Sequence, residues 1–142
     1  MGTTTETTTE TATDVIAKTV WPCVVYDDAL AAITYLTGAF GFEQRIVVAD
    51  GDVVHHAELR WPEGGGIMLG SANREESPFS RQPTGAASVY LVTDEPDALY
   101  ARATAFGVEI IREMEDTDYG SRGFSVRDGE GNLWSIGSYR GT

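Results

Sequence analysis

The sequence predicts an α+β domain made of two consecutive copies of a strand–helix–strand–strand–strand unit. Apolar, β-branched runs typical of strands are separated by polar turns, and a stretch with helical spacing follows the first strand of each half. Residues 57–71 also align without a gap on residues 124–138, a shift of 67 positions. The five identical pairs in this alignment are Arg60 and Arg127, Glu63 and Glu130, Gly64 and Gly131, Gly70 and Gly137, and Ser71 and Ser138.

In the first half, VWPCVVY (20–26) is an apolar run that predicts a strand. Asp27 or Asp28 then caps a helix, whose apolar residues recur at helical spacing until Phe40. Gly41 follows, where a glycine in the left-handed conformation commonly ends a helix. The stretches FEQRIVVA, VVHHAELRW and GIMLGS, separated by the turns DGD and PEGG, supply three further strands.

The second half repeats this order. AASVYLV (86–92) predicts a strand, and a helix starts near Asp94, with Pro96 in its first turn, and ends at Gly107. VEIIREM, SRGFSVR and NLWSIGSY supply the last three strands.

These boundaries define the domain organisation. Residues 1–17 are a Thr-rich segment that we expect to be disordered, and residues 18–142 form one domain. Within it, module 1 spans about 20–71, a polar linker spans 72–86, and module 2 spans about 87–139.

The composition of the chain excludes several classes of binding partner. A net charge of −12, from 22 acidic and 10 basic residues, disfavours nucleic acid. No apolar run is long enough to span a bilayer, and the N-terminal segment lacks the pattern of a signal peptide. The single cysteine, Cys23, excludes an internal disulfide. We therefore expect a cytoplasmic protein that binds neither nucleic acid nor membrane.

Three motifs carry a family resemblance. The ending RDGEGNLWSIGSY resembles the closing hairpin of the vicinal oxygen chelate superfamily, which includes glyoxalases and bleomycin-resistance proteins. VTDEPDAL (92–99) and DDALAAITYLTGAFGF (27–42) resemble the strand-to-helix entries of the same superfamily. This resemblance implies two curled mixed sheets that form a cup, with the helices outside.

Metal-dependent members of that superfamily place four ligands in the cup, on the first and last strand of each module. The motif registers carry those four places over to Trp21, Met68, Ser88 and Ser135. None of these side chains suits a divalent first-row metal, so we expect no metal and no other cofactor.

The pair His55–His56 lies in the third predicted strand. Because neighbouring residues of a strand point to opposite faces, Val54, His56, Glu58 and Arg60 are expected to face the cup. His55, Ala57 and Leu59 are then expected to face the helices. His56 and Glu58 fit either ligand binding and acid–base work or a structural, solvated pair.

Sulfur and aromatic side chains complete the candidate ligand contacts. Cys23 shares a strand face with Trp21, and Tyr90 occupies the matching strand of module 2. Tyr119, in DTDYGSRGF, lies close to the position where W-G-R-E-F of bleomycin-resistance proteins carries its drug-stacking Trp, although the register differs by one residue. Flat aromatic faces suit planar or cationic ligands.

The resulting expectation is a metal-free protein that binds a small molecule, such as an antibiotic or another aromatic or cationic metabolite. The resemblance further implies a homodimer with shared pockets. The competing hypothesis is an enzyme, a glyoxalase-like lyase or isomerase, that uses His56 and Glu58 or a metal site in a different register. A housekeeping binding protein is a third possibility.

Overall fold

The computed structural model describes residues 20–141, so the predicted disordered segment at 1–17 lies outside the described residues. The strands within this range are β1 (Cys23–Tyr26), β2 (Glu43–Asp50), β3 (Val53–Arg60), β4 (Gly66–Ser71), β5 (Ser88–Val92), β6 (Glu109–Asp116), β7 (Arg122–Arg127) and β8 (Leu133–Gly137). The helical elements are α2 (Ala29–Tyr35), its π-helical continuation η1 (Leu36–Phe40), the 3-10 turn η2 (Pro78–Arg81) and α3 (Pro96–Phe106).

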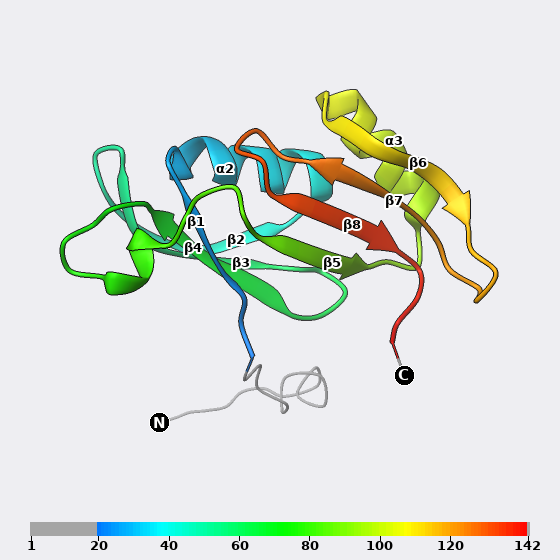
Figure 1. Cartoon of the computed structure of the whole chain (residues 1–142), viewed down its shortest axis with the longest axis horizontal. Helices are drawn as coiled ribbons and strands as arrows, with labels where there is room; N and C mark the ends of the chain where they lie inside the picture. The colour runs from blue at the N-terminus through cyan, green and yellow to red at the C-terminus, as the bar shows by residue number, and fades with distance from the viewer. Residues whose placement is uncertain (1–19, 142) are drawn as a thin grey trace, which may run out of the picture.

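The strands form two four-stranded sheets with the same order, β1-β4-β3-β2 and β5-β8-β7-β6. In each sheet the first strand runs parallel to the last strand of its module, and the other neighbours are antiparallel. In Figure 1, α2 lies along the upper side of the view, and α3 lies beside β6 and β7. The predicted α+β fold with tandem βαβββ modules is therefore confirmed.

Both helices begin and end as the sequence predicts, within a residue or two. The Asp28 carboxylate accepts a hydrogen bond from the backbone N–H of Ala31 at 3.0 Å, which caps α2. Gly41 and Gly107 follow η1 and α3 in the left-handed conformation, with φ of 87° and 102°. Among residues 20–141, no helix is long and apolar enough to cross a membrane.

One hydrophobic core joins the two modules beneath the helices. Trp134 of β8 is fully buried, and its ring lies 5.7 Å from Phe40 and 6.0 Å from Phe42, both of module 1. Aromatic pairs at these distances bury large apolar areas and pack edge to face or tilted. The prediction that Trp134 faces the helices is confirmed.

The repeated glutamates join the modules to each other. Glu130, in the turn before β8, accepts hydrogen bonds from the backbone N–H groups of Asp27 and Asp28, at 2.6 and 2.8 Å. Glu63, at the matching turn of module 1, accepts one from Asp94 at 2.9 Å. Each hairpin turn therefore holds the chain that leads into the other module's helix.

The repeated serines have a matching role. Ser71 Oγ accepts a hydrogen bond from the backbone N–H of Val54 at 2.8 Å, and Ser138 Oγ accepts one from Arg122 at 3.0 Å. In each module the serine at the end of the last strand thus satisfies a backbone donor near the start of the neighbouring strand. The same residue type therefore occurs at 71 and 138 because both serines make the same structural hydrogen bond.

The remaining face of each sheet is turned away from the helices, and we call it the open face. On β3, Ala57 and Leu59 are fully buried in the core, whereas Glu58 and Arg60 alternate with them and are partly exposed. On β7, Phe124 and Val126 are fully buried in the same core. The alternation of the strands separates a core face from an open face in both modules.

Candidate ligand-binding site

The open face of module 1 has a central row of four side chains that lie side by side across the sheet. Met68 of β4 pairs with Cys23 on one side and with Glu58 on the other, and Glu58 pairs in turn with Ile46. Three of the predicted contacts, Cys23, Met68 and Glu58, are therefore neighbours. Their strand pairing, and not their order in the sequence, brings them together.

A pocket of about 300 Å³ lies over this open face. Its floor comes from β1, β3 and β4, and one wall comes from the linker. The lining residues are Cys23, Val24, Val25, His55, His56, Met68, Leu69, Gly70, Arg74, Ser77, Phe79 and Ser80. Of the predicted contacts, Cys23, His56 and Met68 line this pocket, and Glu58 neighbours it.

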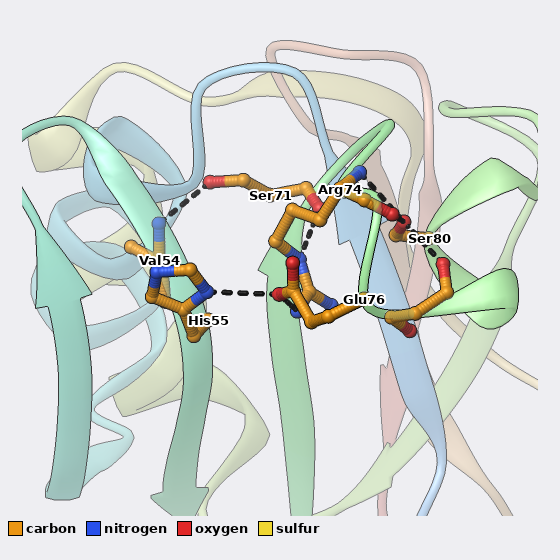
Figure 2. A network of polar contacts seen from close by, with 7 residues as sticks. Val54, His55, Ser71, Arg74, Glu76 and Ser80 are labelled. Atoms are coloured by element: carbon orange, nitrogen blue, oxygen red, sulfur yellow. Dashed lines mark hydrogen bonds and ion pairs between the residues drawn. The ribbon is translucent and has the colours of Figure 1, made fainter.

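The linker wall is built by internal hydrogen bonds, shown in Figure 2. Ser80 is buried, and its Oγ accepts from the backbone N–H of Arg74 at 2.8 Å and donates to the carbonyl of Ser77 at 2.7 Å. The Arg74 guanidinium donates from Nε to the carbonyl of Ser71 at 2.8 Å. These bonds hold Phe79 beside the pocket with 77% of its surface exposed.

His55 and His56 both reach the open face, which corrects the predicted alternation. Val48 pairs with His56 and Ala49 pairs with Val54, so His55 is an extra residue in β3. Such a bulge interrupts the alternation of side chains. Val54 is consequently buried in the core, and His55 lines the same pocket as His56. The predictions that Val54 faces the cup and that His55 faces the helices are wrong.

His55 also joins the linker to the sheet (Figure 2). Its Nδ1 lies 2.8 Å from the Glu76 carboxylate, which receives a second hydrogen bond from Arg74 at 2.7 Å. The hydrogen bond with His55, then the backbone of Glu76 and the Arg74 guanidinium, lower the pKa of Glu76 to about 2. This carboxylate fixes both the imidazole and the linker wall.

His56 and Glu58 form the pair that the sequence suggested. The Nε2 atom of His56 lies 2.8 Å from a carboxylate oxygen of Glu58, and both side chains are partly exposed. The pair stands beside the pocket, where it can hold a polar group of a ligand or exchange a proton with it. Its geometry fits both alternatives.

The four places that the family resemblance assigned to metal ligands hold side chains that do not fit a metal. The ring of Trp21 lies against Gly66, where an added Cβ would come within 2.8 Å of it. Met68 offers a thioether, and Ser88 and Ser135 offer neutral hydroxyls, which bind divalent first-row metals poorly. Within residues 20–141, no three His, Cys, Asp or Glu side chains are grouped so that they can hold a metal ion.

The open face of module 2 has an equivalent central row with different chemistry. Ser135 of β8 pairs with Tyr90 on one side and with Ser125 on the other, and Ser125 pairs with Arg112. Ser88, two residues before Tyr90, is exposed and pairs with Leu133. Sequence reasoning missed Ser125 and Arg112 as functional candidates.

Three tyrosines adjoin this row. The hydroxyl of Tyr90 donates to the carbonyl of Tyr139 at 2.6 Å, and the rings of Tyr139 and Tyr119 meet edge to face at 5.4 Å. The structure thus brings Tyr90 and Tyr119 together through Tyr139, which the sequence did not single out. The sequence did contain a signal for Tyr139, because it is an aromatic residue only two places beyond the end of β8.

Two further depressions lie where the helices begin, related by the 67-residue shift. In the first, Asp128 accepts hydrogen bonds from the hydroxyl of Tyr26 at 2.6 Å and from Nε1 of Trp134 at 3.0 Å. Burial, followed by the bond to Asp128, raises the pKa of Tyr26. Because these polar groups already satisfy one another, the open faces are the better candidate site.

Two βαβββ modules with the same strand order define a duplicated scaffold with one open face on each sheet. The chain belongs to the Glyoxalase/Bleomycin resistance protein/Dioxygenase superfamily, whose family model matches residues 16–136.

Known relatives agree with this assignment. An uncharacterized protein of Mycobacterium bovis is 31% identical over 124 residues, which cover 82% of this chain and 80% of the relative. The structure of TioX from Micromonospora sp. ML1 matches with a TM-score of 0.75 and 26% identity, over 86% of this chain and 98% of TioX. TnmS3, an antibiotic binding protein from Streptomyces sp. CB03234, matches with a TM-score of 0.66 and 21% identity, over 87% and 96%.

Proposed function

We propose that the protein binds a small, partly aromatic organic molecule, such as an antibiotic, through its open faces and without a metal. The pocket of about 300 Å³ over module 1 carries this proposal. Its lining combines sulfur, aliphatic and aromatic side chains with the polar side chains of two histidines, one arginine and two serines, and such a mixture is typical of sites that hold small organic ligands. Binding by shape complementarity needs neither a metal ligand set nor a nucleophile.

Similarity to other proteins supports this proposal. TnmS3, an antibiotic binding protein, has the same fold, and this shared fold is the support that it gives. The charge of the protein adds support for cationic ligands, because Glu58 adjoins the pocket and the net charge is −12. We therefore propose an aromatic or cationic metabolite as the ligand of module 1.

We further propose that two copies associate through their open faces and share pockets. Ile46 and Val48 are 44% and 47% exposed beside Glu58 and His56 on the open face. Apolar side chains grouped on a surface mark interaction sites, and a second copy would remove them from water. Size-exclusion chromatography with light scattering tests this, and a monomer at micromolar concentration would contradict it.

A second candidate function is catalysis as a lyase or isomerase. The contact of 2.8 Å between His56 and Glu58 favours it, because a carboxylate beside an imidazole supports acid–base chemistry. Turnover of a glyoxalase-type substrate that disappears in His56→Gln would support this alternative over simple binding.

We propose a cytoplasmic location, which the free thiol of Cys23 supports. Cys23 is free and exposed at the pocket, where an oxidising environment would convert it to mixed disulfides. This supports a cytoplasmic location.

Tryptophan fluorescence tests the proposed binding. Trp61 and Trp134 are buried, whereas Trp21 is partly exposed against Gly66, so a ligand on the open face should quench mainly Trp21. We expect saturable quenching by members of a panel of drug-sized planar aromatics, and loss of the signal in Trp21→Phe. If no compound in the panel binds, by fluorescence or by calorimetry, the proposed function is wrong.

A further inference from the structure

The central row of module 2 contains a chain of hydrogen-bonded groups that the proposed function has not used. Nε of Arg112 donates to Oγ of Ser125 at 3.3 Å, and the Oγ atoms of Ser125 and Ser135 lie 2.8 Å apart. Ser125 is only 6% exposed, although it lies on the open face. We call these three residues the hydroxyl chain.

The hydroxyl chain has a spare donor. The two serines carry two hydroxyl hydrogens, and one of them lies in the bond between their oxygens. Within the described part of the chain, the other hydrogen has no acceptor. The guanidinium at the start of the chain polarises it, and hydrogen bonds in such series strengthen one another. The chain is therefore prepared to donate to an oxygen acceptor on the open face.

A flat aromatic surface stands next to this donor. Tyr90 is the strand neighbour of Ser135, so their backbones are about 4.8 Å apart. The ring of Tyr90 is 45% exposed, and its hydroxyl is fixed by the carbonyl of Tyr139. A ring stacked on Tyr90 would carry an oxygen substituent over Ser135.

The local charge limits which oxygen group fits. Arg112 is already paired with Glu115, and β6 also carries Glu109 and Asp116. A shared guanidinium amid carboxylates favours one oxyanion or a neutral carbonyl over a polyanion such as a polyphosphate. A cationic group is disfavoured at this end because it would approach the guanidinium.

The central row of module 1 has no hydroxyl or guanidinium donor. The residues of its central row, Cys23, Met68, Glu58 and Ile46, comprise a thiol, a thioether, a carboxylate and an alkyl group. The difference between the rows makes the hydroxyl chain a specific feature of module 2.

We propose that the open face of module 2 recognises an aryl oxyanion, such as an aryl carboxylate. Tyr90 would stack on the ring, and the hydroxyl chain would donate to the carboxylate. This inference rests on the proposed function, since it names the chemical class that the binding site takes.

The test uses two probes with the same ring and opposite charge, naphthalene-2-carboxylate and naphthalen-2-ylmethylammonium, titrated into the full chain by calorimetry. Hydrogen bonds to a charged group contribute about 1.5–3 kcal/mol, or about tenfold or more in affinity. We expect Arg112→Met and Ser135→Ala each to weaken carboxylate binding about tenfold and neither to weaken ammonium binding. Arg127→Met is the matched control, because Arg127 lies on the same strand face as Ser125 and is paired with Glu109.

The outcomes separate this inference from the proposed function. A carboxylate-specific loss in Arg112→Met and Ser135→Ala, absent in Arg127→Met, supports the hydroxyl chain as the recognition element. Equal affinity for both probes in every variant overturns the inference, and aromatic binding remains. Binding of neither probe also overturns the inference, and the fluorescence panel then decides whether the proposed function survives. Circular dichroism of each variant checks that the fold is kept.

Discussion

The two modules share one architecture but present different surfaces. Toward the helices they are alike, with the same strand order and with supporting bonds from the repeated glutamates and serines at matching places. Toward the open side they differ, since module 1 has sulfur, imidazole and a linker wall, and module 2 has hydroxyls, a guanidinium and tyrosines. The comparison indicates that the duplicated framework is constrained by packing, whereas the open faces are free to diverge and to carry specificity.

The largest effect is expected from the core that both modules share. Trp134→Ala removes a fully buried indole and its hydrogen bond to Asp128. Truncating a buried aromatic costs about 3–5 kcal/mol, a large part of a typical domain's stability. Urea unfolding should show this loss, and a change below about 1 kcal/mol would mean that the modules do not depend on one core.

The glutamate contacts between the modules come next and sharpen the comparison, because they are unequal. Glu130 accepts two backbone hydrogen bonds and Glu63 accepts one. We expect Glu130→Ala to lower the free energy of unfolding by about 1–2 kcal/mol and Glu63→Ala by about half of that. Each variant serves as the control for the other. Equal losses of unfolding free energy would contradict the expected difference between Glu130 and Glu63.

The repeated serines should behave alike. Ser71→Ala and Ser138→Ala each remove the acceptor of one strand-end N–H group, which costs about 1 kcal/mol. Chemical denaturation of both variants tests their equivalence. A loss confined to one module would show that the serines do not have the same structural role.

The smallest effect concerns the linker, which has no counterpart in module 2. The folded-state pKa of Glu76 is depressed to about 2 from an ordinary value of 4.5. The stabilisation that ionised Glu76 gives to the folded state is therefore complete above pH 4.5, and it is lost as the pH falls through about 2. NMR titration should show the Glu76 pKa rising toward its ordinary value in His55→Ala, and less in Arg74→Ala. The lowered pKa of Asp97 arises from Arg122 and should stay unchanged.

Local sequence patterns predicted most of the fold. The helix ends at Gly41 and Gly107 and the buried face of β3 at Ala57 and Leu59 follow from chain chemistry and periodicity. The error at His55 arose because a bulge depends on pairing with β2, and nothing within VVHHAELRW marks it.

The candidate site was less accessible to prediction. Strand alternation and the 67-residue shift located Cys23, Met68 and Ser135 on their strands, but their neighbours depend on strand register. Arg112 reaches Ser125 only because β6 is bulged at Ile111. The linker appeared only as a polar connection, and its place over the open face depends on long-range contacts such as that between His55 and Glu76.

The central claim, that small molecules bind the open faces, is tested most directly by NMR chemical-shift mapping with naphthalene-2-carboxylate. We predict perturbations concentrated on Tyr90, Ser125 and Ser135 of module 2. Perturbations concentrated instead around α2 and the turn at Glu130, with the open faces unchanged, would contradict the claim.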